Sequence, residues 1–354
     1  MTKGPKFMTT FFAAANSEEG FVSLFDEIFS PDSLKQIYIL KGGPGSGKST
    51  LMRSIGAEAE ALGLKTEYLF CSSDTDSLDG IIIPAVAAAI LDGTAPHAKD
   101  PVYPGVAERI VNLGEAFDHE ALARKKSLIE AQIREKAACY RSAYRFLSAA
   151  GIMERERIAL LGSVYLSEKA KAAANRLINS LRELPKGPSS HRYLSAIGTK
   201  GIVRLSAPAH KHYAVTESHG AGYLFMQALY EALTEKGAAM TVCKTPLSKD
   251  RIEAIILKNE DLCFSVCDEK TVSDADKTVN CLRFLQKEKL SASRSRLREA
   301  EKHVRALTES AVLRLREAGA CHARTETIYG ACIDFKKIDA VQARLRREIF
   351  KNIM

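Results

Sequence analysis

The stretch Gly42-Gly-Pro-Gly-Ser-Gly-Lys-Ser-Thr50 decides how this chain folds, because it fits the pattern G-x4-G-K-[S/T] in full. A short apolar run, Gln36–Leu40, precedes it, and an Ala-, Leu- and Glu-rich stretch typical of a helix follows over residues 48–62. A strand, a glycine-rich turn and a helix N-terminus in this order form a P-loop, whose backbone N–H groups surround a phosphate. The sequence therefore predicts a nucleotide-binding α/β protein.

The residue types of this loop each suit a part of a nucleotide. Glycines let the backbone turn tightly, Lys48 carries a charge for the β- and γ-phosphates, and the Ser49 hydroxyl suits Mg²⁺. Thr50 is expected to lie toward the α-phosphate. The predicted nucleotide-binding residues are Gly42, Gly43, Pro44, Gly45, Ser46, Gly47, Lys48, Ser49 and Thr50.

A carboxylate is expected at the end of a neighbouring strand, where it would organise the magnesium ion. The run Ala87-Ala-Ala-Ile-Leu-Asp92 ends in such a residue, so Asp92 is assigned to the metal together with Ser49, and to catalysis together with Lys48. The alternative is that Asp92 only caps the turn that it begins. No Glu follows Asp92, so the usual general base of an ATPase is missing from its usual place, which predicts slow hydrolysis.

Two further groups of polar residues follow predicted strands. His97 ends the loop Asp92-Gly-Thr-Ala-Pro-His and is a candidate catalytic residue. His97 or Thr94 would sense the γ-phosphate or position water; a surface histidine is the alternative. Asp74, Asp76 and Asp79 follow the second strand. They would bind a cationic or hydroxylated substrate or cap a short helix, and capping is the favoured interpretation.

The chain repeats itself. Phe12–Val22 resembles Tyr193–Val203 at an offset of 181, Gly45–Met52 aligns with Gly220–Gln227 at 175, and Leu147–Gly151 resembles Leu315–Gly319 at 168. The order is preserved, so two homologous units are expected, residues 1–186 and 187–354, joined in the Pro/Gly/Ser-rich segment 184–190. Because the segment after residue 10 recurs at Tyr193, it belongs to the fold rather than to a cleavable signal peptide.

The predicted architecture is α/β, with two tandem P-loop NTPase-like units, each a parallel sheet flanked by helices and followed by a long helical arm. The first arm is expected over 120–144 and 153–183 with a break near Gly151, and the second over 285–317 and 322–350 with a break near Gly319. The second unit is degenerate, since Tyr223 and Leu224 align with Lys48 and Ser49. Asp268 is the candidate equivalent of Asp92.

Composition argues against a membrane-spanning, zinc-binding or disulfide-bonded protein. The 354 residues are 46% hydrophobic and 27% charged, with a net charge of +8. The longest apolar stretch, 81–91, is too short to cross a bilayer, which needs about 20 residues. The eight scattered cysteines include no CxxC and no Cys/His pair at zinc spacing, and Cys263 and Cys267 are interpreted as buried thiols of a cytoplasmic protein.

The positive charge concentrates in the predicted arms. Residues 115–185 hold 13 Lys/Arg against 9 Asp/Glu, and residues 286–354 hold 16 against 9. Basic helices could bind nucleic acid or an acidic protein partner. The favoured alternative is that mixed charges solvate the helices and form i,i+4 pairs, because the arms lack aromatic interleaving.

With the phosphate loop, Ser77-Leu-Asp-Gly-Ile-Ile-Ile-Pro84 and Ile90-Leu-Asp-Gly-Thr-Ala-Pro-His97 in view, the chain resembles the tandem P-loop ATPase-like (nucleotide-kinase-like) proteins of Firmicutes. This resemblance extends over nearly the whole chain and implies the fold, nucleotide binding and a preference for ATP. That family often keeps a lysine-bearing loop in its second half, and Tyr223 and Leu224 depart from it.

Three functions follow from these observations. The first is an Mg-ATP-dependent NTPase, slow alone, whose nucleotide state moves the helical arms. The second is a small-molecule or nucleotide kinase, favoured by the short spacing from Lys48 to Asp92 and by lid-like helices, although no substrate motif is recognisable. The third is a non-enzymatic, nucleotide-dependent scaffold whose arms bind a partner.

Overall fold

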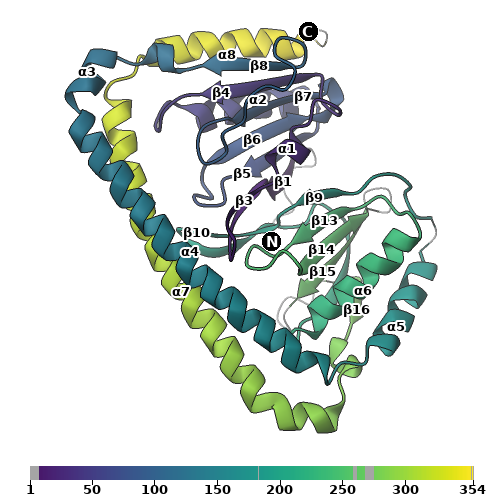
Figure 1. The fold of residues 1–354 in the computed structure, drawn as a ribbon. Helices are drawn as coiled ribbons and strands as arrows, with labels where there is room; N and C mark the ends of the chain where they lie inside the picture. The colour runs from purple at the N-terminus through teal and green to yellow at the C-terminus, as the bar shows by residue number, and fades with distance from the viewer. Residues whose placement is uncertain (1–7, 182, 258–260, 268–274, 352, 354) are drawn as a thin grey trace.

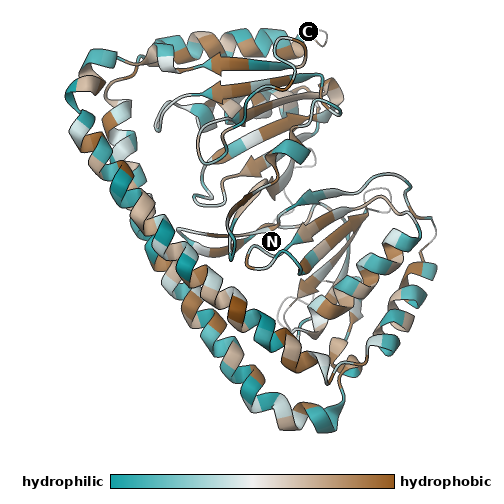
Figure 2. Ribbon diagram, viewed as in Figure 1, coloured by the Kyte–Doolittle hydropathy of each residue, from teal (hydrophilic) through white to brown (hydrophobic). Residues whose placement is uncertain are grey.

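The computed structural model describes residues 8–181, 183–257, 261–267, 275–351 and 353. Two six-stranded sheets are joined by two long helices that lie side by side (Figure 1). The strands of both sheets are largely apolar, whereas the long helices mix polar and apolar residues along their length (Figure 2). The protein is therefore an α/β protein with two similar sheet–helix units.

The first sheet has the strand order β1-β5-β6-β7-β4-β8. Strand β6 runs antiparallel to both of its neighbours, β5 and β7, and the remaining strand pairs are all parallel. In sheet order the strands are β1 (Met8–Phe12), β5 (Thr66–Phe70), β6 (Leu78–Ile83), β7 (Ala88–Asp92), β4 (Gln36–Lys41) and β8 (Glu108–Asn112).

The second sheet repeats this arrangement, and its reversed strand is β14. Its strands, in the corresponding order, are β9 (Ser190–Arg192), β13 (Thr241–Lys244), β14 (Ile252–Leu257), β15 (Leu262–Cys267), β12 (Lys211–Thr216) and β16 (Lys277–Val279). The same order with the same reversed strand supports the predicted internal repeat. The expectation of purely parallel sheets is wrong: β6 and β7 are joined only by the short 3-10 helix η1 (Pro84–Val86), and so short a connection allows only antiparallel pairing.

A hairpin from each unit meets its counterpart in the middle of the molecule. The hairpins are β2–β3 (Ala14–Ser17, Gly20–Ser23) and β10–β11 (Ser195–Gly198, Gly201–Arg204). Just before them, Phe12 and Tyr193 exchange both backbone hydrogen bonds, at 2.8 and 3.0 Å. These two residues are repeat equivalents, as are Asn16 and Ile197, which are joined by a 2.8 Å side-chain hydrogen bond. Equivalent residues that pair with each other place a two-fold-like axis at this contact.

The two long helices are α4 (Lys126–Gly162) and α7 (Lys287–Gly330). The breaks expected at Gly151 and Gly319 are wrong, because both glycines lie inside continuous helices. A Cβ on Gly151 would overlap the side chain of Glu18, and one on Gly319 would overlap Thr199. These glycines therefore allow each hairpin to approach a long helix closely, and they do not end it.

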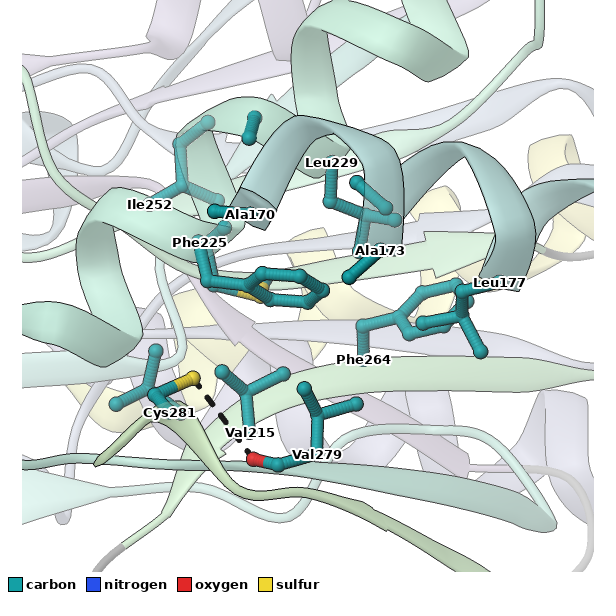
Figure 3. Close-up of a cluster of buried hydrophobic side chains, with 14 of the residues drawn as sticks. Ala170, Ala173, Leu177, Val215, Phe225, Leu229, Ile252, Phe264, Val279 and Cys281 are labelled. Carbon is teal, nitrogen blue, oxygen red and sulfur yellow. Dashed lines mark hydrogen bonds between the residues drawn. The ribbon is translucent and has the colours of Figure 1, made fainter. Parts of the chain in front are cut away.

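The helix that follows each long helix packs on the sheet of the opposite unit. After α4, helix α5 (Ser167–Asn179) packs on the second sheet, where its apolar face meets Phe225 and Phe264 (Figure 3). After α7, helix α8 (Phe335–Phe350) packs on the first sheet beside α2 (Lys48–Ala61). Each half of the sequence thus completes the hydrophobic core of the other.

The remaining helices are short or lie against one sheet. Helix α6 (Ala221–Glu235) covers the second sheet in the way α2 covers the first. The others are α1 (Phe25–Ile28), α3 (His119–Arg124), η2 (Gly114–Ala116) and η5 (Cys281–Phe284). The division into residues 1–186 and 187–354 stays a prediction about repeat units, and the hydrophobic cores do not follow it, because α5 and α8 exchange places.

All eight cysteines are free thiols, and Cys263 and Cys267 are buried, as the sequence predicts. No helix in the described part of the chain is both long and apolar enough to span a bilayer.

Because α8 packs on the sheet of the opposite unit, a core substitution in α8 should destabilise the first unit. Phe350 is fully buried in the first unit although it lies at the end of the second repeat. Replacing Phe350 by Ala is expected to cost about 3–5 kcal/mol of stability, as for other large-to-small core changes. Hydrogen exchange should therefore become faster in β4 and α2 and stay unchanged in β12 and α6.

Leu313→Ala is the matched control, because that α7 side chain is half exposed. It should leave both units unchanged. Faster exchange in the second unit alone after Phe350→Ala would contradict the packing of α8 on the first sheet.

Candidate functional site

The glycine-rich loop of the first unit, residues 42–47, connects β4 to α2. Gly47 is the N-cap of α2 with φ +79°, and Gly45 has φ +67°, a region that side-chain-bearing residues rarely adopt. Lys48 is the first residue of the helix, so the loop sits against the positive end of the α2 dipole. The local structure expected from the sequence, strand then loop then helix, is confirmed.

Lys48 and Asp92, which are 44 positions apart in the sequence, lie together at this loop. The Lys48 Nζ is 3.5 Å from a carboxylate oxygen of Asp92, and it donates to the carbonyl oxygens of Gly42 and Gly43 at 2.8 and 3.0 Å. Strand β7 runs beside β4 in a register that pairs Asp92 with Leu40, and this register brings the carboxylate to the loop. Both side chains are largely buried, at 11% and 18% exposure.

The hydroxyl residues of the loop differ in their surroundings. Ser46 is buried and donates to the Gly43 carbonyl at 2.8 Å, which stabilises the loop from within. The Ser49 oxygen accepts the Leu78 N–H at 3.0 Å, which leaves its own proton and a second lone pair for a ligand. Thr50 is exposed on the first turn of α2.

Asp92 is fixed by the loop that follows it. One of its carboxylate oxygens accepts both the N–H and the hydroxyl of Thr94, at 2.9 and 2.6 Å. Lys41, at the end of β4, donates to the carbonyl oxygens of Gly93 and Lys99, both at 2.8 Å. Asp92 therefore does cap its own turn, and its other oxygen still faces Lys48.

His97 lies in the interior, not at the surface. Its ring stacks on Phe25 at 4.6 Å, contacts Phe21 edge-on at 4.9 Å, and is only 8% exposed. Its Nε2 is 3.3 Å from a carboxylate oxygen of Asp79. Burial by itself lowers the His97 pKa, but the charges of Asp79 and Asp92 outweigh burial and raise it overall. The surface alternative is wrong, and the contacts of this ring are with Asp79, Phe21 and Phe25.

The three aspartates after β5 have separate environments. Asp74 accepts hydrogen bonds from the Asp76 N–H and the Ser77 hydroxyl, which stabilises a turn. Asp76 is exposed and pairs with Lys200 of the second unit's hairpin at 2.6 Å. Asp79 lies inside β6. The expected short helix does not form, so the capping prediction holds only for Asp74, at a turn.

The end of α7 covers the glycine-rich loop. A Cβ on Gly43 would lie 2.9 Å from the Tyr329 ring, and one on Gly45 would lie 2.8 Å from the carbonyl oxygen of Glu326. The Tyr329 ring also packs edge-on against Phe117. Only glycine fits beneath this helix at these two positions, so the glycine-rich loop and the end of α7 are complementary in shape. Sequence reasoning missed these contacts, because they join residues about 280 positions apart and leave no local pattern.

Two nitrogen-bearing side chains stand beside this contact, one from each long helix. The Lys136 Nζ of α4 is 3.5 Å from the Nδ1 of His322 on α7, whose Nε2 is 3.6 Å from Glu326. Burial lowers the pKa of both groups, and the charges of Lys136 and Lys48 lower that of His322 further. His322 is therefore harder to protonate than an ordinary histidine, and it lies within electrostatic reach of Lys48.

The corresponding loop of the second unit is shorter and is filled by a carboxylate. Gly220, with φ +105°, caps α6, so Ala221 and Gly222 take the places of Lys48 and Ser49 at the helix start. The expected alignment of Tyr223 and Leu224 with those residues is therefore shifted by two positions. The Glu217 carboxylate accepts the N–H groups of Gly220 and, at 3.1 Å, of Gly222.

Helix α4 supplies the charge that faces this carboxylate. Arg157 lies 3.8 Å from Glu217 and is itself held by Glu154 at 2.8 Å. Arg251 pairs with the same Glu154 and lies 3.5 Å over the ring of Tyr223. Burial raises the Glu217 pKa against the opposing influence of both arginines. At the positions of Lys48 and Ser49 the start of α6 thus offers neither a lysine nor a hydroxyl, in agreement with a degenerate site. Asp268 lies outside the described residues, and Val266 holds the register position of Asp92.

Charges on the long helices pair with one another. Glu130 lies near both Lys126 and Arg134 along α4, and ion pairs between the two helices join Arg296 to Glu156 and Arg324 to Glu135. Such pairs support the interpretation that the mixed charges solvate the helices.

Comparisons with protein-family models, curated proteins and solved structures found no match to this chain. The resemblance to the tandem ATPase-like family therefore stays a prediction carried by the motifs.

If the Glu217 carboxylate holds the loop of the second unit, its removal should lower the stability of the protein. Glu217→Ala would leave the Gly220 and Gly222 N–H groups without their acceptor, which is expected to cost about 1–3 kcal/mol. Inorganic phosphate should stabilise this variant more than the unaltered protein, because the freed N–H groups at the α6 N-terminus suit an anion. Thermal unfolding with and without phosphate measures both effects.

Glu231→Ala is the control, since Glu231 is an exposed residue of the same helix. Equal stability of Glu217→Ala and the unaltered protein would show that the carboxylate does not hold the loop.

Proposed function

We propose that this protein is an Mg-ATP-binding P-loop NTPase whose nucleotide site is the glycine-rich loop of the first unit. The observation that carries the proposal is the placement of Lys48 within 3.5 Å of Asp92, at the N-terminus of α2 and beneath a loop with two glycines at positive φ. A phosphate at this position would meet backbone N–H groups, a helix dipole and a lysine together. ATP as the nucleotide rests on the family resemblance.

The oxygen donors present fit a magnesium ion. Mg²⁺ prefers hydroxyl and carboxylate oxygens, and Ser49 and Asp92 offer one of each at the loop. Bound there, the ion would neutralise charge on the β- and γ-phosphates. Thr94 and Lys41 hold the Asp92 turn in place, so the carboxylate needs little rearrangement to serve this role.

The same loop supports slow rather than fast hydrolysis. Lys48 would move from the loop carbonyls to the phosphate oxygens, where its charge stabilises the transition state. No glutamate follows Asp92 to activate water. His97, the remaining candidate, faces Asp79 and two phenylalanines, so its role in the proposal is to hold the Asp92 loop from behind.

The contact between the glycine-rich loop and α7 would couple nucleotide binding to the position of that helix. Tyr329 and the Glu326 carbonyl lie directly on Gly43 and Gly45, so a loop that changes shape around phosphates displaces or tightens that helix end. Both long helices are fixed to the sheets by α5 and α8. The movement we propose is therefore a shift of one joined helical pair between the units, not a swing of two free arms.

Phosphate release tests the catalytic part of the proposal. Lys48→Ala is expected to lower the rate of phosphate release from Mg-ATP by about a hundredfold or more, because a principal transition-state charge is lost. Tyr223→Phe is the control, since it keeps the ring beside Arg251 in the first turn of α6 and should leave the rate unchanged.

Turnover at the full rate in Lys48→Ala would contradict the proposal. ATP consumption that depends strictly on an added acceptor would instead favour the kinase. Tight ATP binding without turnover under either condition would favour the nucleotide-dependent scaffold.

Hydrogen exchange tests the coupling. ATP is expected to slow amide exchange over residues 322–330 of α7, because the ordered loop supports the helix end that packs on it. The change should be absent in Lys48→Ala. Protection confined to the loop and α2 in the unaltered protein would contradict the coupling and leave nucleotide binding intact.

A further inference from the structure

A cysteine, an aspartate and a histidine meet at the edge of the first sheet, apart from the glycine-rich loop. Cys71 directly follows β5, Asp79 lies in the reversed strand β6, and His97 comes from the loop after β7. One candidate ligand atom of each residue lies within 4.8 Å of those of the other two. Asp79 is only 4% exposed and His97 only 8%. Sequence spacing hides this cluster, because the three residues come from three different segments.

The cluster is polar, buried and incompletely satisfied. One Asp79 carboxylate oxygen is buried without a hydrogen-bond partner, although it lies 3.3 Å from the His97 Nε2. The other ring nitrogen of His97, Nδ1, is also buried without a partner. A buried carboxylate oxygen that has a ring nitrogen nearby but no hydrogen bond of good geometry is poorly satisfied, and an ion bound beside it would satisfy it.

We propose that Cys71, Asp79 and His97 bind a divalent transition-metal ion of the zinc class. Thiolate, imidazole and carboxylate are the three donors that zinc takes in proteins, with bonds of about 2.3 Å to sulfur and about 2.0–2.2 Å to nitrogen and oxygen. Those bonds set tetrahedral edges of about 3.3–3.7 Å between ligand atoms. The 3.3 Å from Asp79 to His97 already matches such an edge, and the Cys71 sulfur lies within 4.8 Å of a ligand atom of each of these residues.

The donor set separates this site from the magnesium site of the proposed function. Mg²⁺ takes hard oxygen ligands, whereas sulfur and imidazole select softer ions. Zinc would bind the Cys71 thiolate, with the thiol proton released to solvent and no change in oxidation state. Three protein ligands leave a fourth tetrahedral position for water.

The position of the site would let an ion link three segments of the chain. It would join the end of β5, strand β6 and the loop that begins at Asp92, all at one edge of the sheet. Phe25 and Phe21 already hold the His97 ring on its other sides. An ion here would therefore fix the loop that carries Asp92, whether or not that loop serves a nucleotide.

A zinc titration tests the site directly. The intact protein, first freed of metal with a chelator, is titrated with Zn²⁺ in competition with a chromophoric chelator. One tightly bound zinc per chain is expected, and Cys71→Ser should weaken binding at least about a hundredfold, beyond the effect typical of residues that only support a ligand. Cys139→Ser is the control, because that thiol lies on α4 beside Glu317 and is not part of the cluster, and it should not change the affinity.

Cobalt gives a second readout that reports the sulfur ligand itself. Co²⁺ at the site should produce sulfur-to-cobalt charge-transfer absorption that disappears in Cys71→Ser and persists in Cys139→Ser. Thermal unfolding of the metal-free Cys71→Ser protein shows whether that variant is folded. Zinc binding of equal strength in Cys71→Ser and the unaltered protein, or no stoichiometric binding in the latter, would overturn the proposal.

Discussion

The packing of α4 against α7 is the constraint on which the rest of the structure depends. Equivalent residues, Ala143 with Ala311 and Leu147 with Leu315, are buried together in the contact. Because each helix begins at one sheet and ends at the other, α5 and α8 complete cores that their own repeats do not contain. Neither hydrophobic core is complete without the helix that the other repeat contributes, α5 for the second sheet and α8 for the first.

The same scaffold carries two loops with opposite chemistry. In the first unit the loop keeps glycines, a lysine and a hydroxyl beneath the end of α7. In the second, Glu217 binds the helix N-terminal N–H groups and Arg157 of α4 faces it. A carboxylate of the chain thus stands where an anion would bind, which lets the second unit keep the shape of a loop without a ligand. This asymmetry is the strongest structural argument that the two units have different roles.

The sequence predicted what depends on local pattern. The glycine-rich loop, the strand before it, the helix after it and the placement of Asp92 beside Lys48 follow from motif chemistry and strand–helix alternation, and the repeat follows from direct comparison. The reversed direction of β6 was missed because Ile81–Leu91 is a single apolar run in which the 3-10 turn leaves no polar signal. The glycines at 151 and 319 were misread as breaks, since a glycine that permits close approach looks the same in sequence as one that ends a helix.

What the sequence could not predict is contact between distant segments. Tyr329 over Gly43, Arg157 beside Glu217, and the meeting of Cys71 with Asp79 and His97 arise only when the helices cross and the strands align. The sequence around each of these residues does not set it apart from other helix, strand or loop residues. Only their contacts in the folded protein show what they can bind.

The number of ATP molecules bound per chain at equilibrium, measured by titration calorimetry with Mg²⁺ present, tests the central claim most directly. One bound ATP is expected, because the first loop has Lys48 and the second is filled by Glu217. None is expected in Lys48→Ala. Two bound molecules, or one that persists in Lys48→Ala, would contradict the claim that the two loops differ in this way.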